Sequence, residues 1–314
     1  MLHPFTVTVP ATTANLGPGF DCLGAALSLH NRFSFLPAQK SKTEGPSGSG
    51  VTIQVRGEEA ARVATGAENL VYQVFCQFFE ALGQTPPSLR LEIELGVPLA
   101  RGLGSSATAI VGGLLGANYW AGNPLSLQAL MRMAIDLEGH PDNVVPALLG
   151  GCQLAASDNQ DWFHCTVAWH PEIVPVVAIP HFELSTAAAR QVLPQDYCRA
   201  DVVFNTAHLA LLVKGLETGD GEQLRVGMQD RVHQPYRQKL IPGYGAVHEA
   251  AVQAGAYGLA ISGAGPTLLA LTSTADAPRV VAAMEQAWQR QKTTVTVRSL
   301  SLDRQGANIS KSVG

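Results

Sequence analysis

The chain has 314 residues, a mass of 33.1 kDa and a formal net charge of −4 at pH 7. This nearly balanced charge disfavours a nucleic-acid partner, and 46% hydrophobic against 15% charged residues excludes a disordered chain. The five cysteines are scattered without a Cys-x-x-Cys pair, which suggests neither a disulfide framework nor a zinc site. We therefore expect reduced thiols and, because no signal-peptide pattern opens the chain, a cytoplasmic protein.

The first elements follow from residue type and alternation. A β-branched run at residues 6–9, ending at Pro10, predicts a strand. Residues 15–24 are dense in glycine, proline and aspartate and predict a loop. Residues 37–50 are polar and rich in glycine and serine, which predicts a mobile surface connection. Alternating apolar and polar residues then predict a half-buried strand over 51–55.

The next segments alternate between helical and strand periodicity. Apolar residues four apart predict an amphipathic helix over residues 69–82, and strict alternation predicts a strand over 89–95. Residues 104–120 are apolar nearly all round and predict a buried helix behind a glycine-rich turn. Residues 125–137 predict another helix.

A new series of strand and helix patterns begins after the glycine pair at residues 150 and 151. We therefore expect an N-terminal domain of residues 1–154 and a C-terminal domain of residues 155–314. Two uncharged stretches, residues 102–131 and 255–275, are interrupted by glycine and proline. Their apolar parts are shorter than the roughly 20 residues that a membrane span requires, so no membrane partner is expected.

The most informative segment is residues 98–108, Pro-Leu-Ala-Arg-Gly-Leu-Gly-Ser-Ser-Ala-Thr, between a predicted strand and a predicted helix. Glycines allow backbone N–H groups to approach an anion, and the helix N-terminus adds about half a positive charge. Ser105 and Ser106 can cap the helix, bond phosphate oxygens or ligate Mg²⁺. The alternative interpretation is a plain glycine-rich turn with serine caps.

Two common phosphate motifs compete for this segment. A Walker A loop is excluded because no lysine follows the second glycine. The Gly-x-Gly-x-x-Ala pattern matches a dinucleotide fingerprint, but the first acidic residue that follows is Asp136, too distant for that motif. This spacing disfavours a nicotinamide-dependent oxidoreductase.

Three further loops carry polar groups on bent backbone. In residues 15–21, Asp21 is a candidate for holding a substrate ammonium group, or else it forms an Asx turn. In residues 138–143, Glu138 offers the hard carboxylate oxygen that Mg²⁺ prefers. Residues 262–267 form a second glycine turn.

Together these loops resemble a known family. Residues 98–107 look like the phosphate loop of the superfamily of galactokinase, homoserine kinase, mevalonate kinase and phosphomevalonate kinase. Five other segments are similar to the homoserine kinase branch: residues 15–24, 138–143, 185–194, 234–237 and 262–267. Six motifs in the expected order are far more specific than any one alone.

The resemblance implies an α+β fold of two domains, an ATP-binding phosphate-loop domain and a ferredoxin-like C-terminal domain, with the site between them. It implies phosphoryl transfer from ATP to L-homoserine, a step toward threonine, with Mg²⁺ as cofactor and a homodimer as the assembly. ATP binding is implied for Asn69, Pro98, Leu99, Ala100, Arg101, Gly102, Leu103, Gly104, Ser105, Ser106, Ala107 and Thr108.

The remaining roles follow residue by residue from the resemblance. Mg²⁺ is expected between Glu138 and Ser105 or Ser106. The zwitterionic substrate needs an anion for its ammonium and a cation for its carboxylate, which suits Asp21 and two arginines. The substrate-binding set is Asn15, Asp21, His140, Asn143, Arg190 and Arg237.

Catalysis is expected to depend on Glu138, Asp142 and Arg237. Asp142 is the candidate general base, although a loose phosphoryl-transfer transition state mainly requires positioning and charge stabilisation. The alternatives are another small-alcohol kinase of the superfamily, such as a mevalonate kinase, or a non-catalytic ATP-binding regulator. Mevalonate has no ammonium group for Asp21 to bind, which disfavours the first alternative.

Overall fold

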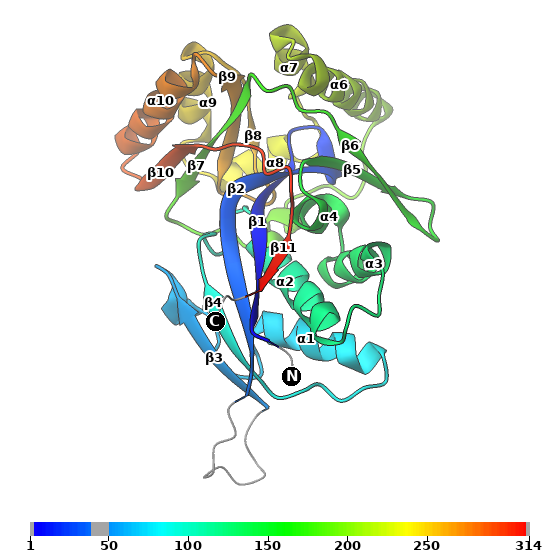
Figure 1. Cartoon of the computed structure of the whole chain (residues 1–314). Coiled ribbons are helices and arrows are strands. Elements are labelled where there is room, and N and C mark those ends of the chain that lie inside the picture. The colour runs from blue at the N-terminus through cyan, green and yellow to red at the C-terminus, as the bar shows by residue number, and fades with distance from the viewer. Residues whose placement is uncertain (1–2, 39–49, 312–314) are drawn as a thin grey trace.

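The computed structural model describes residues 3–38 and 50–311, which form two β-sheets with helices packed on them (Figure 1). Seven strands of the described chain form the first sheet: β1 (Phe5–Asn15), β2 (Gly19–Pro37), β3 (Val51–Arg56), β4 (Leu89–Glu94), β5 (Cys152–Ser157), β6 (Trp162–Val167) and β11 (Asn308–Lys311). Their order is β11-β1-β2-β4-β3, with β5 paired to β2 and β6 to β5.

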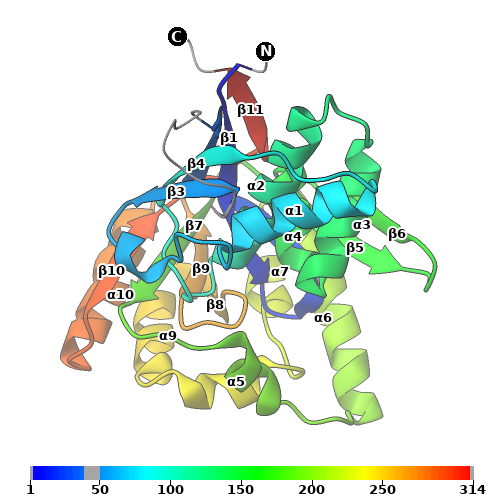
Figure 2. The same ribbon diagram turned by 90° about the horizontal axis from the view of Figure 1, so that it is seen from below.

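Four helices cover one face of the first sheet (Figures 1 and 2). They are α1 (Leu70–Ala81), α2 (Ser105–Trp120), α3 (Leu127–Glu138) and α4 (Pro141–Leu149). Helix α2 lies close to β2 because it carries glycines on that side. A Cβ at Gly112 would lie 2.4 Å from the ring of Phe33, and one at Gly116 would lie 2.1 Å from Phe35. These glycines explain how a mostly apolar helix packs closely against β2 in the core.

The second sheet has four strands in the order β10-β7-β9-β8, all antiparallel. They are β7 (Ile173–Pro180), β8 (Ala256–Ile261), β9 (Leu268–Ser273) and β10 (Val295–Ser299). Helices α9 (Tyr244–Gln253) and α10 (Ala277–Arg290) pack on one face, while α6 (Arg199–Thr218) and α7 (Gly221–Gly227) pack on the other. The described residues also contain four short helices: η1 (Ala60–Arg62), α5 (Thr186–Gln191), α8 (Gln234–Arg237) and η2 (Gln238–Leu240), which directly follows α8.

The two sheets share a hydrophobic core. Strand β7 sends Val176 toward α9 and α10, and Val177 toward a cluster that includes Ala11 of β1 and Leu23 of β2. This alternation follows from the two-residue period of a strand. The same cluster contains Leu103 of the phosphate loop. The loop therefore lies where the two sheets meet.

The division between the sheets does not coincide with the expected division after residue 154. Strand β6 lies beyond that point and pairs with β5 in the first sheet, and β11 near the C-terminus pairs with β1. The chain enters the second sheet at β7 and returns to the first at its end. Composition could not indicate this return, because the sequences of β6 and β11 are those of ordinary short strands and do not show which sheet they join.

Two predictions for the N-terminal region are wrong in extent. The first strand does not end at Pro10 but continues to Asn15, because Pro10 lies beside a shift of register that tolerates a missing N–H donor. Residues 15–24 are not one loop, since β2 begins at Gly19. Of the predicted surface connection, residues 39–49 lie outside the described residues.

The other predicted helices and strands are confirmed, with bounds shifted by a few residues: the helices at 69–82, 104–120 and 125–137 are α1, α2 and α3, and the strands at 51–55 and 89–95 are β3 and β4. Among the described residues, none of the helices combines the length and the hydropathy that crossing a bilayer would demand.

Candidate active site

The phosphate loop, residues 98–108, connects β4 to α2 through left-handed backbone. Ala100, Gly102 and Gly104 have φ values of 53°, 77° and 67°. Gly104 is the N-cap of α2, and a Cβ there would lie 2.0 Å from Oγ1 of Thr12. The predicted glycine-rich turn before a helix is therefore confirmed, and the first N–H groups of α2 face outward at its positive end.

The turn at residues 262–267 packs directly against the phosphate loop. Ser262 donates through Oγ to the carbonyl of Gly102 at 2.6 Å, and Thr267 N donates to the carbonyl of Arg101 at 3.2 Å. A Cβ at Gly102 would lie 2.3 Å from the carbonyl oxygen of Ser262. The two glycine turns thus fit together only without side chains, which fixes the loop against the second sheet.

Arg101 anchors the loop. Its guanidinium donates to the carbonyl oxygens of Leu99, Pro180 and His181 at 2.7, 3.1 and 3.1 Å. It also forms ion pairs with Glu59 and Glu183. Since the residue is only 8% exposed, most of its donors are committed to protein acceptors. In the phosphate loop, the positive field therefore comes mainly from backbone N–H groups and the helix N-terminus.

Glu138, the last residue of α3, lies beside the start of α2. Its Oε2 accepts a hydrogen bond from Oγ of Ser106 at 2.8 Å. Burial raises the pKa of Glu138, and the bond from Ser106 together with His140 partly opposes that shift. A carboxylate that has lost solvation in this way is stabilised by a cation placed next to it.

The turn after Glu138 begins helix α4 and holds a chain of bonded polar groups. Nδ1 of His140 lies 2.6 Å from Oδ1 of Asp142, which is only 3% exposed. Asn143 donates to Asp142 at 3.3 Å and accepts from the hydroxyl of Thr12 at 2.8 Å. Burial alone would lower the pKa of His140, but the hydrogen bond and charge of Asp142 outweigh it, so that the pKa is raised.

Asp21 and Arg190 form a bidentate ion pair, with N–O distances of 2.8 and 2.9 Å. The hydrogen bond to Asp21 raises the pKa of Arg190 further above its usual value. Asn15 supports the position of Asp21 by accepting from its backbone N at 3.0 Å, and it donates to the carbonyl of Gly263 at 3.0 Å. The two charged groups that the sequence assigns to opposite ends of the substrate are therefore in contact with each other.

Arg237 lies close to this pair but is almost fully buried, at 2% exposure. Its guanidinium stands 5.0 Å from the ring centre of Phe20, and that of Arg190 stands 5.6 Å from the same ring. Burial and, secondly, the charge of Arg190 lower the pKa of Arg237. The two arginines thus converge on one aromatic ring.

These groups surround one cavity of about 530 Å³ between the two sheets. Its lining includes these residues that the sequence predicts: Asn15, Asp21, Ala100, Arg101, Gly102, Gly104, Ser105, Ser106, Glu138, His140, Asp142, Asn143, Arg190 and Arg237. The backbone of the phosphate loop contributes to the lining together with Ser106 and Glu138, which are bonded to each other. The ion pair of Asp21 and Arg190 contributes to it as well. The arrangement suits a phosphate chain that faces a small zwitterion.

Six residues predicted to bind ATP do not line this cavity. Asn69 caps α1 by accepting from Val71 N and donates to the carbonyl of Ala64. The others are partly or fully buried in the loop or in α2: Pro98, Leu99, Leu103, Ala107 and Thr108. Pro98 borders a neighbouring cavity of about 490 Å³, together with Arg101, Glu58 and Glu59.

The sequence reasoning missed several residues of the site. Thr12 bonds Asn143 and limits the space at Gly104, yet it lies in a strand without any motif signal. Thr186, Gly263 and Gly265 line the cavity. All three lie in segments that resemble motifs of the homoserine kinase branch, so those motifs could have indicated them.

The fold and this site define the class of the protein. The family model described as "GHMP kinases N terminal domain" matches residues 69–151. The model described as "GHMP kinases C terminal" matches residues 212–290. The first range contains the phosphate loop and Glu138, and the second contains Arg237 and the 262–267 turn. The chain is a GHMP kinase, which confirms the predicted fold class.

Full-length relatives narrow the assignment. The homoserine kinase of Trichodesmium erythraeum is 59% identical over 306 residues, covering 98% of both chains. That of Trichormus variabilis is 60% identical over 302 residues, covering 96% of this chain and 97% of the relative. The crystal structure of homoserine kinase from Cytophaga hutchinsonii matches with a TM-score of 0.86 at 30% identity, covering 99% of this chain and 98% of that one. The chain belongs to the homoserine kinase family.

Proposed function

We propose that this chain transfers the γ-phosphoryl group of ATP to the side-chain hydroxyl of L-homoserine, producing ADP and O-phospho-L-homoserine, a precursor of threonine. The observation that carries the proposal is the cavity of about 530 Å³ whose lining combines the backbone of the phosphate loop with the side chains of Asp21, Arg190 and Arg237. Membership of the homoserine kinase family supports the same reaction.

On the ATP side, the phosphates would lie over residues 102–107 at the start of α2. Backbone N–H groups and the helix N-terminus stabilise negative charge there without a P-loop lysine. Because the nearby positive charge is built from the backbone, it needs little reorganisation when charge develops in the transition state.

The donor set beside the phosphate loop fits Mg²⁺. Glu138 and a loop serine offer hard oxygen ligands, and the raised pKa of Glu138 reflects a carboxylate that burial leaves short of solvation. Glu138 with Ser105 or Ser106 would hold the ion. When bound, Mg²⁺ would neutralise charge on the β- and γ-phosphates.

On the homoserine side, Asp21 and Arg190 offer one negative and one positive charge, which are complementary to the two charges of the substrate. We propose that the α-ammonium group binds Asp21 and the α-carboxylate binds Arg190 and Arg237, so that the substrate inserts between the paired groups. Asn15, His140 and Asn143 would supply further hydrogen bonds.

For the transfer step we propose that positioning and charge stabilisation dominate. The sequence predicts Asp142 as the general base, but Asp142 is only 3% exposed and is already bonded to His140 and Asn143. A loose transition state requires little proton removal before bond formation, so Arg237 and the phosphate loop can carry the step without Asp142 as a base.

A coupled ADP-release assay tests the function. We expect ATP turnover with L-homoserine to exceed turnover with mevalonate or galactose by at least about 100-fold in kcat/KM, since only homoserine offers an ammonium group to Asp21. A Glu138→Gln preparation, purified in parallel, controls for contaminating kinases. Equal turnover of all three alcohols would contradict the substrate assignment, and no turnover would favour an ATP-binding regulator.

We further propose that the protein is a cytoplasmic homodimer. The proposal on location is supported by the free thiols of its five cysteines, which suit a reducing compartment. Size-exclusion chromatography with light scattering, with an expected mass of twice 33.1 kDa, tests the assembly.

A further inference from the structure

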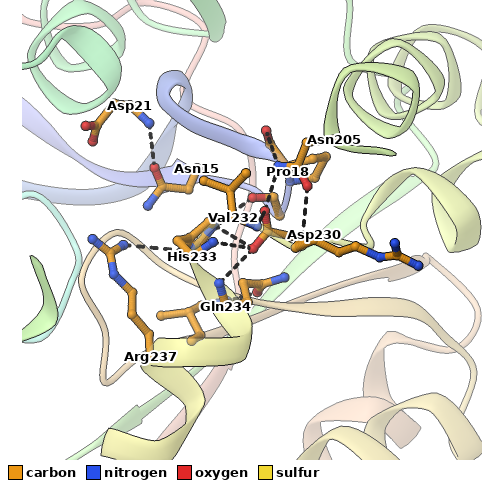
Figure 3. Close-up of polar contacts among 12 residues, drawn as sticks. Asn15, Pro18, Asp21, Asn205, Asp230, Val232, His233, Gln234 and Arg237 are labelled. Atoms are coloured by element: carbon orange, nitrogen blue, oxygen red, sulfur yellow. Dashed lines mark hydrogen bonds and ion pairs between the residues drawn. The ribbon is translucent and has the colours of Figure 1, made fainter. Parts of the chain in front are cut away.

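Behind the substrate side of the cavity, Arg237 ends the four-residue helix α8 (Gln234–Arg237). This helix follows a loop in which Gln229 and Arg231 are exposed but His233 is buried. Figure 3 shows this loop, with Asp230 and His233, between the turn after β1 and helix α6. His233 is 0% exposed, and the side chain of Asp230 is 0% exposed. Neither residue lines the cavity with Arg237, so neither is part of the proposed chemistry.

The imidazole of His233 is held in one tautomer. Its Nε2 lies 2.7 Å from the carbonyl oxygen of Gly17, in the turn between β1 and β2. Because a carbonyl oxygen can only accept, Nε2 carries the proton. Burial lowers the pKa of His233 despite the opposing charge of Asp230, so the ring is neutral and Nδ1 keeps its lone pair.

That lone pair faces Arg237. Nη1 of Arg237 lies 3.4 Å from Nδ1 of His233 and 3.0 Å from the carbonyl of Gly263, and Nε lies 3.0 Å from the carbonyl of Ala189. Since a guanidinium can only donate, the opposite tautomer of His233 would place two donors against each other. In the described residues, 3–38 and 50–311, no protein group accepts from Nη2 of Arg237. Nη2 therefore remains available to a ligand.

Asp230 fixes the loop that carries His233. Its carboxylate accepts from the backbone N of Val232, His233 and Gln234 at 3.0, 2.9 and 2.7 Å. It also accepts from Nδ2 of Asn205 at 2.7 Å. A buried charge is stabilised here by four donors, as burial of a carboxylate requires. The start of α8 is thereby tied to α6.

We infer that His233 is a positioning residue for substrate binding, whose unprotonated Nδ1 holds the guanidinium of Arg237 so that its remaining edge faces the substrate carboxylate. This inference rests on the proposed function, in which Arg237 binds that carboxylate. The carbonyl of Gly17 sets the tautomer, and Asp230 holds the ring in place. The β1–β2 turn directly precedes Asp21 of β2, and through His233 it also acts on Arg237.

Two amide substitutions at His233 test the roles of the two ring nitrogens separately. In His233→Asn the amide oxygen can take the place of Nδ1 and accept from Arg237. In His233→Gln the amide nitrogen can take the place of Nε2 and donate to Gly17. We expect His233→Gln to raise KM for homoserine about 10-fold and His233→Asn to raise it less than about 3-fold, with KM for ATP unchanged in both.

The relation between the two variants decides the inference. Equal increases in KM for homoserine, or equal increases for homoserine and ATP, would overturn it, because a residue that only fills space would not distinguish the two nitrogens. Thermal melting of both variants measures the structural cost separately.

A double-mutant cycle tests whether His233 acts through Arg237. In an Arg237→Ala background we expect His233→Gln to change homoserine affinity, measured by calorimetry, by less than about 2-fold. A further loss as large as in the wild-type background would overturn the inference. If wild-type enzyme did not bind or phosphorylate homoserine, the proposed function would fail instead.

A spectroscopic test needs no variant to be active. In protein labelled with ¹⁵N-histidine we expect the His233 ring, assigned by its loss in His233→Asn, to show the neutral Nε2–H form. Its Nδ1 signal is expected to shift on Arg237→Ala. A protonated ring, an Nδ1–H tautomer or an unchanged Nδ1 signal would overturn the inference.

Discussion

The two walls of the cavity are built from different groups. The phosphate wall, residues 102–106, offers backbone N–H groups at the start of α2, and its shape depends on the absence of side chains at Gly102 and Gly104. The substrate wall offers the charged side chains Asp21, Arg190 and Arg237, which come from segments far apart in the sequence. Under the proposed function, the phosphate wall would bind an anion through backbone geometry, and the substrate wall would bind a zwitterion through charge.

This difference has consequences for how each wall responds to change. Any side chain at Gly102 or Gly104 would overlap atoms packed against the backbone, so a substitution there is disruptive. The ion pair of Asp21 and Arg190 has side-chain exposures of 33% and 39%, so it can open and close without disturbing the fold. Mutations in the phosphate wall should therefore abolish ATP binding, whereas mutations in the substrate wall should change which alcohol substrate is preferred.

The largest effect is expected from Gly104→Val. A Cβ at this left-handed residue would lie 2.0 Å from Oγ1 of Thr12, and a branched side chain resists φ > 0. We expect kcat/KM for ATP to fall roughly 1,000-fold, in keeping with a cost of several kcal/mol. Calorimetry with ATP and a circular dichroism spectrum measure binding and folding separately.

Gly122→Val is the matched control for Gly104→Val. Gly122 has a φ of 85°, and a Cβ there would have nothing within 4 Å. It shares the backbone strain but lies in the turn after α2, so ATP affinity should stay unchanged. Similar ATP affinity in folded Gly104→Val and in the control would show that the loop does not bind phosphate.

Glu138→Gln is the second test of the phosphate wall. The amide keeps the shape and can still accept from Ser106, but it lacks the charge that would hold Mg²⁺. We expect kcat to fall about 100-fold with little change in melting temperature. A titration of activity against Mg²⁺ measures the effect, and wild-type turnover across that titration would rule out Glu138 as a ligand.

Asp21→Asn tests the charged wall. Losing a charge-assisted partner costs about 1.5–3 kcal/mol, which corresponds to roughly 10- to 150-fold in kcat/KM for homoserine. An analogue with hydrogen in place of the α-amino group should lose much less. Equal losses for the two substrates would mean that Asp21 serves only to hold Arg190.

Arg190→Ala supplies the complementary measurement. It should penalise homoserine more than the methyl ester of homoserine, because only the former carries a carboxylate. The fold should remain intact, since a partly exposed ion pair contributes at most about 1 kcal/mol.

The smallest effect is a pH-dependent contribution to stability from His140. Burial would lower the pKa of His140, but the hydrogen bond and charge of Asp142 raise it above the usual value of 6.5. The folded state therefore binds this proton more tightly than the unfolded state. The resulting stability is fully present below pH 6.5 and is lost as pH rises through the raised pKa. Melting of His140→Gln should thus differ from the wild type more at pH 5.5 than at pH 9, whereas an equal difference would contradict the pairing.

The local sequence determined much of the phosphate wall and of its supporting core. Glycine spacing in residues 98–108, the serines at the start of α2 and the apolar pattern of α1 and α2 are signals between neighbours in the chain. Such signals predict local elements well because turn geometry and helix capping depend on adjacent residues. The order of the six motifs indicated the family, and the family in turn indicated the expected reaction.

Only the tertiary structure decided which distant groups meet. Asp21 pairs with Arg190 across 169 positions, and His233 reaches the carbonyl of Gly17 across 216. Strand β11 returns to the first sheet, so the chain does not divide between the sheets where the composition changes. No local pattern marks such contacts, because they depend on the packing of whole elements around a shared core.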